Sequence, residues 1–194
     1  MRFSAGAVFW TVVLAGLVPL FVLRYRSLTL PGKAFVAWDR TVIWVRLAEW
    51  ADIFLYLAVI YRWRWNFALT RHTRAAAAVG LIVTLLGVIL TAWSKIVLGA
   101  WFSTTLGVKP GHQVVTRGPY RLVRHPMYSG LLLVLLGGAL VYNSGAVLLL
   151  LCAPFCGLFY WQSVIEERLL AAHFGDAFSQ YRGATGRLFP HLLR

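Results

Sequence analysis

The chain has 194 residues, of which 60% are hydrophobic and only 13% are charged. Because a soluble domain has about a quarter of its residues charged, this composition excludes an ordinary soluble domain and predicts an all-α integral membrane protein. The formal net charge is +13, but the cations lie in short segments between apolar runs. That pattern is typical of membrane topology and lipid contact, and it argues against nucleic-acid binding.

Five apolar stretches are predicted to cross the bilayer as helices of a single domain. They are Phe3–Leu23, Thr41–Tyr61, Ala75–Trp93, Met127–Tyr142 and Ala146–Ser163. The first has no small-residue cleavage site near its end, so we interpret it as a retained span rather than a signal peptide. The last two are joined by Asn143-Ser144-Gly145, which is typical of a tight turn and predicts an antiparallel hairpin.

The second and third spans each carry an informative pattern. Arg46, Glu49 and Asp52 follow one another at intervals of three residues and share a helical stripe. Charges at that depth must face protein or water, so they form either an internal ion pair that fixes packing or part of the lining of a substrate cavity. In the third span, Gly80 and Gly87 would allow a neighbouring helix to approach closely.

The distribution of Lys and Arg predicts the orientation in the membrane. If the N-terminus is outside, the inner segments 24–40, 94–126 and 164–194 hold 13 basic residues, whereas the outer segments hold 5. We therefore expect a multi-pass protein of a bacterial or archaeal inner membrane, with a cytoplasmic C-terminus.

The polar stretch Thr116–Tyr128 leads directly into the fourth span. Pro126 is suited to the first turn of a helix, which places His125 near the N-cap. Free N–H groups and the positive helix end make that position favourable for a carboxylate, and Arg121 and Arg124 add positive charge. Taken alone, the stretch fits a topology signal at the membrane surface equally well.

Glu166 and Glu167 follow the fifth span directly, in a chain with only six acidic residues. They belong either to a solvated helix surface or to a site where one of them binds a cation such as an α-ammonium group. The predicted hairpin brings them beside the start of the fourth span. An anion-binding helix end and a cation-binding carboxylate then become neighbours, which suits an amino-acid-like ligand.

Two motifs carry a resemblance to a known family. RGPYRLVRHPMYSG, followed after one hairpin by EERLLAAHFGDAFSQYRGATGRLFP, resembles the isoprenylcysteine carboxyl methyltransferases, which belong with the membrane phospholipid N-methyltransferases. The resemblance covers about residues 101–191, within the second half 94–194, whereas the first half 1–93 is similar only in having membrane spans. It implies methyl transfer from S-adenosylmethionine to a lipophilic, membrane-partitioned acceptor such as a prenylcysteine carboxylate.

The resemblance also implies a set of site residues. The residues expected to contact the cofactor are His112, Gln113, Val114, Val115, Tyr120, His125, Pro126, Met127, Tyr128 and Glu166, with Glu166 holding the ammonium group. The candidate catalytic residues are Arg124, His125 and Glu167. His125 and Glu167 are the nearest candidates for a general base, and Glu167 is alternatively a partner of Arg124 or Arg187. The C-terminal GATGRLFP is expected to close over the site as a lid.

One position departs from the prenylcysteine enzymes, which carry an arginine four residues before the first glutamate. Here that residue is Gln162, which shares a helical face with Glu166 but cannot neutralise a carboxylate. Gln162 and, from the second span, Arg46 are the candidate substrate-contacting residues. A phospholipid amine, a small thiol or another lipophilic acceptor stays open.

Other functions fit parts of the pattern. Membrane sterol reductases that use NADPH resemble this fold, but the short chain and the glutamate motif favour a methyltransferase. A transporter would more often show repeats and interrupted helices. Cys152 and Cys156 have no nearby His or Asp partner, so no metal site is predicted.

Overall fold

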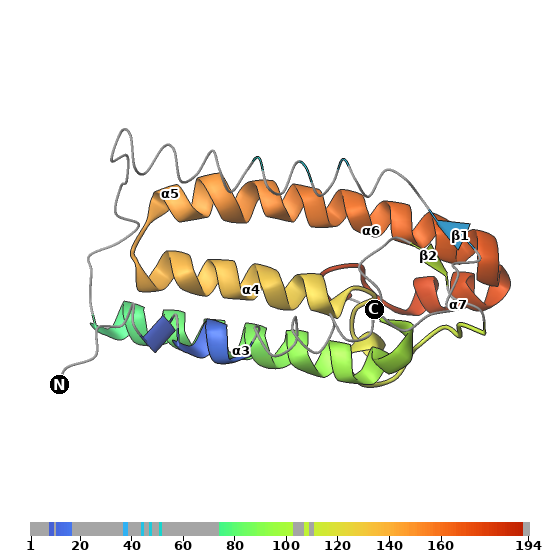
Figure 1. Ribbon diagram of the computed structural model, residues 1–194, viewed down its shortest axis with the longest axis horizontal. Coiled ribbons are helices and arrows are strands. Elements are labelled where there is room, and N and C mark those ends of the chain that lie inside the picture. The colour runs from blue at the N-terminus through green and yellow to red at the C-terminus, as the bar shows by residue number, and fades with distance from the viewer. Residues whose placement is uncertain are drawn as a thin grey trace.

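The computed structural model describes residues 8–9, 11–16, 37–38, 44, 47, 51, 74–102, 107–108 and 111–191. Over these residues the protein is mostly helical. Its longer helices are α3 (Arg74–Leu98), α4 (Pro126–Val141), α6 (Ala153–Phe174) and α7 (Asp176–Ala184). Figure 1 shows α4 between α3 and α6, with α7 at the end where α6 stops. The prediction of a helical protein is therefore confirmed for the described part of the chain.

Shorter elements connect these helices. They are the 3₁₀ turns Gly99–Trp101 and Gly118–Arg121, the single turn α5 (Gly145–Val147), the π-helical turn Leu148–Cys152, and the strands β1 (Ala37–Trp38) and β2 (Gly107–Val108). The two strands pair antiparallel over two residues each. This small pairing departs from a purely α-helical fold, because two extended connectors satisfy part of their backbone with each other.

Two described helices are long and apolar enough to cross a membrane, namely Arg74–Leu98 and the continuous helix Gly145–Phe174. α4 is apolar but has only 16 residues. Both long helices continue past the predicted spans. Each ends just before a glycine with a positive φ, which is +54° at Gly99 after α3 and +53° at Gly175 after α6. Most of the predicted spans Phe3–Leu23 and Thr41–Tyr61 lies outside the described residues.

α3 and α4 pack with almost no side chain between their backbones. A Cβ atom on Gly87 would lie 2.6 Å from the carbonyl oxygen of Gly130, and one on Gly80 would lie 2.8 Å from that of Gly137. On α3, the buried hydroxyl of Thr84 donates to Gly80 O at 2.9 Å, so it brings no unpaired polar group into the interface. The expected close contact at Gly80 and Gly87 is therefore present, and its partner is α4.

The predicted hairpin between the last two spans is also present. Asn143 adopts a left-handed φ of +49°, and Ser144 caps the following turn by accepting a hydrogen bond from Val147 N at 3.2 Å. Leu148–Cys152 then forms the π-helical turn, immediately before Pro154 in the first turn of α6. The end of α6 consequently returns to the level where α4 begins (Figure 1).

The backbone just before α4 is bonded to the C-terminal tail. Val123 forms a parallel bridge with Gly186. Arg124 N donates to Gly186 O at 2.8 Å and His125 N donates to Arg187 O at 3.0 Å. These bonds join segments about sixty residues apart, and they hold the tail against the start of α4.

Candidate functional site

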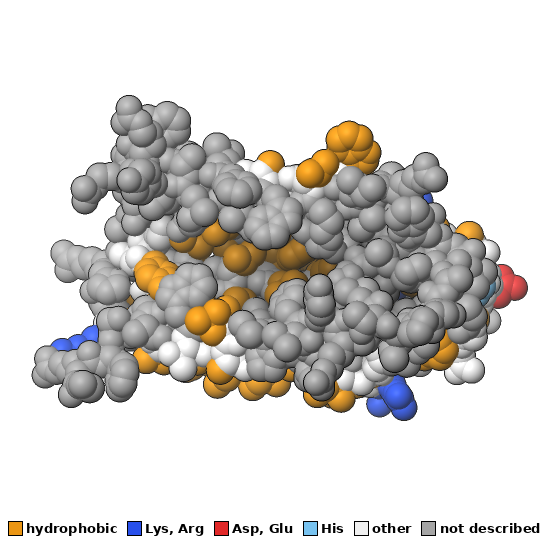
Figure 2. Space-filling model, in the orientation of Figure 1, with side chains coloured by type: hydrophobic (Ala, Val, Ile, Leu, Met, Phe, Trp, Pro, Cys, Tyr) orange, Lys and Arg blue, Asp and Glu red, His pale blue; other side chains and the backbone are white. Residues whose placement is uncertain are grey.

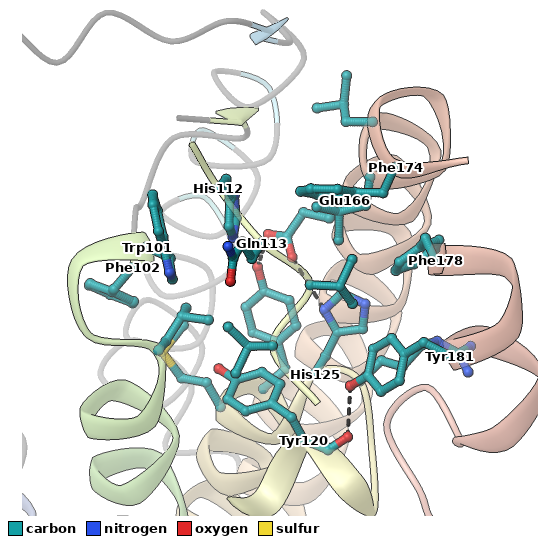
Figure 3. A pocket seen from close by; sticks show the side chains of 18 residues that line it. Trp101, Phe102, His112, Gln113, Tyr120, His125, Glu166, Phe174, Phe178 and Tyr181 are labelled. Carbon is teal, nitrogen blue, oxygen red and sulfur yellow. Dashed lines mark hydrogen bonds and ion pairs between the residues drawn. The ribbon is translucent and has the colours of Figure 1, made fainter. Parts of the chain in front are cut away.

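A cavity of about 140 Å³, partly open to solvent, lies where the ends of α3, α4 and α6 meet α7 (Figure 3). The predicted cofactor residues that line it are His112, Gln113, Val114, Val115, Tyr120, His125, Met127, Tyr128 and Glu166. Pro126 is buried at the first turn of α4 and is not part of the lining.

Sequence reasoning missed the other eight residues of the lining. They are Leu98 at the end of α3, Trp101 and Phe102 after it, Leu169, Leu170 and Phe174 on α6, and Phe178 and Tyr181 on α7. The residues on α6 follow Glu166 at helical spacing, which is a signal that could have identified them. The others approach the cavity only through the tertiary fold.

Glu166 points into the cavity from α6, toward His125 (Figure 3). Its side chain is 28% exposed, and its Oε2 lies 3.2 Å from Nδ1 of His125. The hydroxyl of Tyr128 donates to its other oxygen, Oε1. Glu166 is therefore a carboxylate that faces an open, ring-lined space, as a cation-binding group would.

Glu167 does not line the cavity and is only 3% exposed. Its oxygens accept from Nε of Arg124 at 2.8 Å, from Nη2 of Arg187 at 2.8 Å and from Nε of Arg187 at 3.1 Å. Nε2 of His125 lies 3.3 Å away. Neighbours on a helix differ by about 100° in direction, which explains why two adjacent glutamates have such different surroundings. Glu167 is thus engaged by the two arginines that the sequence named as its alternative partners.

His125 lies between the two carboxylates, with one ring nitrogen directed at each. Burial by itself lowers the pKa of His125, but the hydrogen bonds to Glu166 and Glu167 outweigh it and raise that pKa above its ordinary value. The raised pKa favours the protonated ring, in which both nitrogens donate and no lone pair is left to accept a further proton. The role of His125 as a general base stays a prediction.

Arg124 lines the cavity, but its guanidinium group is hydrogen-bonded to other parts of the protein. Besides Glu167, it donates through Nη1 to Arg182 O at 3.0 Å and to Thr185 O. One side chain thus ties the segment before α4 to α6, to α7 and to the tail. Arg121, by contrast, is exposed and lies outside the lining.

Aromatic rings form much of the remaining wall (Figure 3). The rings of Trp101 and His112 stack at 5.1 Å, and Phe174 meets His112 edge-on at 5.6 Å. The hydroxyl of Tyr181 donates to Tyr120 O at 2.7 Å, which joins α7 to the turn before α4. Burial raises the pKa of Tyr120, with smaller contributions from Glu166 and Tyr181, so its hydroxyl stays neutral.

Gln162 is 2% exposed, lies one turn before Glu166 on α6 and does not line the cavity. Arg46 lies outside the described residues. Residues 185–188 of the expected lid lie against the start of α4, whereas α7 contributes Phe178 and Tyr181 to the lining of the cavity. The reason is that the tail uses its backbone carbonyl groups to bond Arg124 and His125. Within the described residues, no group of three His, Cys, Asp or Glu is arranged to hold a metal ion.

Comparisons with known proteins identify the relatives of this chain. The sequence model of a family described as phospholipid methyltransferase matches residues 75–177. The chain is 32% identical over 112 residues to the cobalt-zinc-cadmium resistance protein CzcN of Cupriavidus metallidurans, covering 58% of this chain and 50% of that protein. It is 32% identical over 99 residues to the protein-S-isoprenylcysteine O-methyltransferase of Schizosaccharomyces pombe, covering 50% and 42%. A probable protein-S-isoprenylcysteine O-methyltransferase of Oryza sativa is 26% identical over 105 residues, covering 53% and 55%. The chain thus spans about half the length of these curated relatives.

Proposed function

Since this chain belongs to the phospholipid methyltransferase family, we propose that it transfers a methyl group from S-adenosylmethionine to a lipophilic acceptor in the membrane. The observation that carries the proposal is the cavity, in which the partly exposed carboxylate of Glu166 faces a wall of aromatic rings. Relatives named protein-S-isoprenylcysteine O-methyltransferase support methyl transfer at the level of the family.

The residues present suit this cofactor. Its α-ammonium group needs an anionic partner, and Glu166 offers a carboxylate that is partly shielded from water. A hydrogen bond to a charged group contributes about 1.5–3 kcal/mol. Its sulfonium carries a positive charge that the faces of tyrosine and tryptophan rings attract, and Tyr120, Tyr128 and Trp101 all line the cavity. Bound there, S-adenosylmethionine supplies an already activated methyl group.

The chain's own contribution to methyl transfer is then alignment and the exclusion of water. We propose that Glu167 acts as a positioning residue, because its oxygens are occupied by Arg124, Arg187 and His125. Through these bonds it fixes His125, which in turn orients Glu166. Arg124 has the same supporting role, because its guanidinium group is bonded on the side away from the ligand space.

The acceptor is proposed to arrive from the bilayer. The face of α3 that turns away from α4 carries exposed apolar side chains at Val79, Ile82, Leu86 and Ile89, and Figure 2 shows hydrophobic side chains along that edge. This surface suits contact with lipid. With five spans and a cytoplasmic C-terminus, the cavity would take its cofactor from the cytoplasm and its acceptor from between the helices.

A binding experiment tests the cofactor. Purified protein in detergent is melted with S-adenosylmethionine, with NADPH and without ligand; a ligand that binds only the folded state raises the melting temperature. We expect stabilisation by S-adenosylmethionine alone. Stabilisation by NADPH alone would support the reductase function and contradict the proposal. Transfer of a labelled methyl group from S-adenosylmethionine into extracted lipids then tests the activity itself.

A further inference from the structure

The C-terminal tail bridges α4 and α6 beside the cavity. In the first turn of α4, the hydroxyl of Ser129 donates to Leu188 O at 2.6 Å. One residue earlier in the tail, the guanidinium carbon of Arg187 lies 4.8 Å from the centre of the Tyr160 ring on α6. Neighbouring tail residues thus contact two different helices, which places the tail between them.

The side chain of Leu188 fills space between the two helices. It is 5% exposed and belongs to one apolar cluster with Tyr128 of α4 and Phe159 of α6, whose rings stack at 5.0 Å. Tyr128 and its neighbour Met127 also line the cavity. The cluster is therefore continuous with the cavity wall. Away from the cavity it extends along α4 and α6 through Leu131, Leu132 and Phe155.

The opposite side of α4 is closed in a different way. The backbones of α3 and α4 touch at Gly87 and Gly130, where a Cβ atom on Gly87 would lie 2.6 Å from a carbonyl oxygen. A hydrocarbon chain could pass there only by separating the two helices. Between α4 and α6 the space is filled by side chains instead, and one of these belongs to the tail. Of these two helix pairs, only α4 and α6 could therefore admit an apolar chain without moving apart.

The tail is held far more firmly before Leu188 than at Leu188 itself. The carbonyl groups of Gly186 and Arg187 accept bonds from the backbone before α4, and the Arg187 side chain pairs with Glu167 at 2.8 Å. Leu188 has one hydrogen bond among the described residues, the bond from Ser129 to its carbonyl oxygen. Arg187 is thus the last firmly held residue, and a hinge directly after it would free Leu188.

Release of Leu188 would cost little in hydrogen bonding. The hydroxyl of Ser129 has a second acceptor within reach, His125 O at 3.2 Å, so it keeps a partner when Leu188 leaves. The leucine side chain can be taken up by the bilayer, because lipid tails are as apolar as leucine. The space that it leaves is lined by Tyr128 and Phe159 and would suit another apolar group.

We propose that Leu188 is a displaceable plug between α4 and α6, and that the hydrocarbon chain of the methyl acceptor enters from the bilayer by taking its place. This inference rests on the proposed function. The entering chain contacts Tyr128 and Phe159, and its head group reaches the cavity past Met127. The tail thereby keeps the cavity closed to bulk lipid while no acceptor is bound, and it admits molecules whose apolar part can displace a leucine side chain.

The test uses the full chain in lipid nanodiscs with a hexadecanol that carries a photoreactive diazirine in the middle of its chain. Irradiation attaches this probe to nearby residues, which mass spectrometry identifies. We expect labelling at Tyr128 or Phe159, both of which are buried. Ser129→Ala removes the hydrogen bond to Leu188 O and should increase that labelling about two- to tenfold, the effect of one hydrogen bond. Leu188→Ala removes the plug itself and should increase it at least as much.

Phe189→Ala is the matched control, since Phe189 is the next tail residue, is 66% exposed and lies outside the apolar cluster. It should leave the labelling of Tyr128 and Phe159 unchanged. The exposed side chains of Val79 and Ile82 on α3 serve as an internal reference for contact with bulk lipid.

The inference is overturned if the two buried rings are not labelled in any variant, or if neither Ser129→Ala nor Leu188→Ala increases their labelling. It is also overturned if Phe189→Ala or the α3 reference shows an equal increase, because that result would indicate general loosening. Labelling is measured with and without S-adenosylmethionine, and cofactor binding is measured separately. Absence of cofactor binding would contradict the proposed function, whereas the labelling tests the plug directly, so the two failures are distinguishable.

Discussion

Two regions hold the described fold together by opposite means. The α3–α4 interface is uncharged and consists of small residues whose backbones touch, as at Gly87 and Gly130. The cluster around Glu167 is charged, and its side chains converge on one carboxylate from two segments, namely the residues just before α4 and the C-terminal tail. The first region has no space for an added atom, whereas the second cannot lose a charge. The close helix contact makes the base of the site rigid, and the charged cluster orients the polar side chains beside it.

The charged region is predicted to show the largest effect. Glu167→Gln removes the charge that Arg124, Arg187 and His125 share, and it leaves buried cations without a counter-charge. Breaking a buried ion pair costs about 3–5 kcal/mol. We expect a loss of unfolding free energy of that order, measured by thermal or denaturant unfolding in detergent. Glu166→Gln, at the neighbouring position, should change stability far less; an equal loss in both variants would contradict the difference between the two glutamates.

The uncharged region is predicted to respond to one methyl group. Gly87→Ala places a Cβ atom 2.6 Å from Gly130 O, whereas nothing lies within 4 Å of a Cβ atom on Gly157. Overpacking costs about 1–3 kcal/mol, while an exposed helical Gly→Ala exchange stabilises by about 0.5–1 kcal/mol. We therefore expect Gly87→Ala to lower the melting temperature and Gly157→Ala to leave it equal or higher. A fall of the same size in both variants would show that the interface is looser than its geometry indicates.

The third prediction separates binding from stability. Glu166→Gln should weaken S-adenosylmethionine binding by about ten- to a hundredfold, the equivalent of one charged hydrogen bond. Titration calorimetry in detergent measures the change. Asp176→Asn is a control of the same chemistry, because Asp176 is exposed at the start of α7 and does not line the cavity. Unchanged affinity in Glu166→Gln would remove Glu166 as the ammonium partner.

The smallest predicted effect is a pH dependence of stability. Because the pKa of His125 is raised in the folded protein, its contribution to stability is fully present below its unfolded pKa of about 6.5 and is lost as the pH rises through the folded value. The groups that face it are Glu166, Glu167 and Tyr128, with Arg124 beside it. Melting temperatures between pH 6 and pH 9 should fall for wild type more steeply than for His125→Gln. Parallel curves would contradict a protonated His125.

The parts of the site that could be predicted from the sequence are those with local causes. Pro126 at the first turn of α4 follows from its missing N–H group, and the hairpin follows from Asn143-Ser144-Gly145. The pair of glutamates could be recognised from its position directly after the fifth predicted span, and the resemblance then implied that Glu166 holds the ammonium group of the cofactor. The positions of Trp101 and Phe178 could not be predicted, because they depend on how α3 and α7 meet the other helices.

The tail shows the same limit in another form. The family resemblance implied a lid here, but nothing local in GATGRLFP indicates that the carbonyl groups of Gly186 and Arg187 bond the backbone before α4. The unpaired Oε1 atom of Gln162 could likewise not be predicted from the sequence, which shows only the helical face on which this residue lies. Hydrogen-bond partners that are far apart in the chain depend on tertiary packing, so they cannot be predicted from the spacing of motifs.

The hydrogen bond between Arg124 N and Gly186 O also restricts the number of membrane crossings between these two residues. A chain that leaves a point on one side of a bilayer and returns to bond that point must cross the bilayer an even number of times in between. α4 and the helix Gly145–Phe174 would provide two crossings if both span the bilayer as the sequence predicts. The sidedness of the tail therefore equals that of the segment before α4, whatever path residues 1–73 take. A single reporter inserted after His191 would consequently identify the compartment from which the cavity is filled.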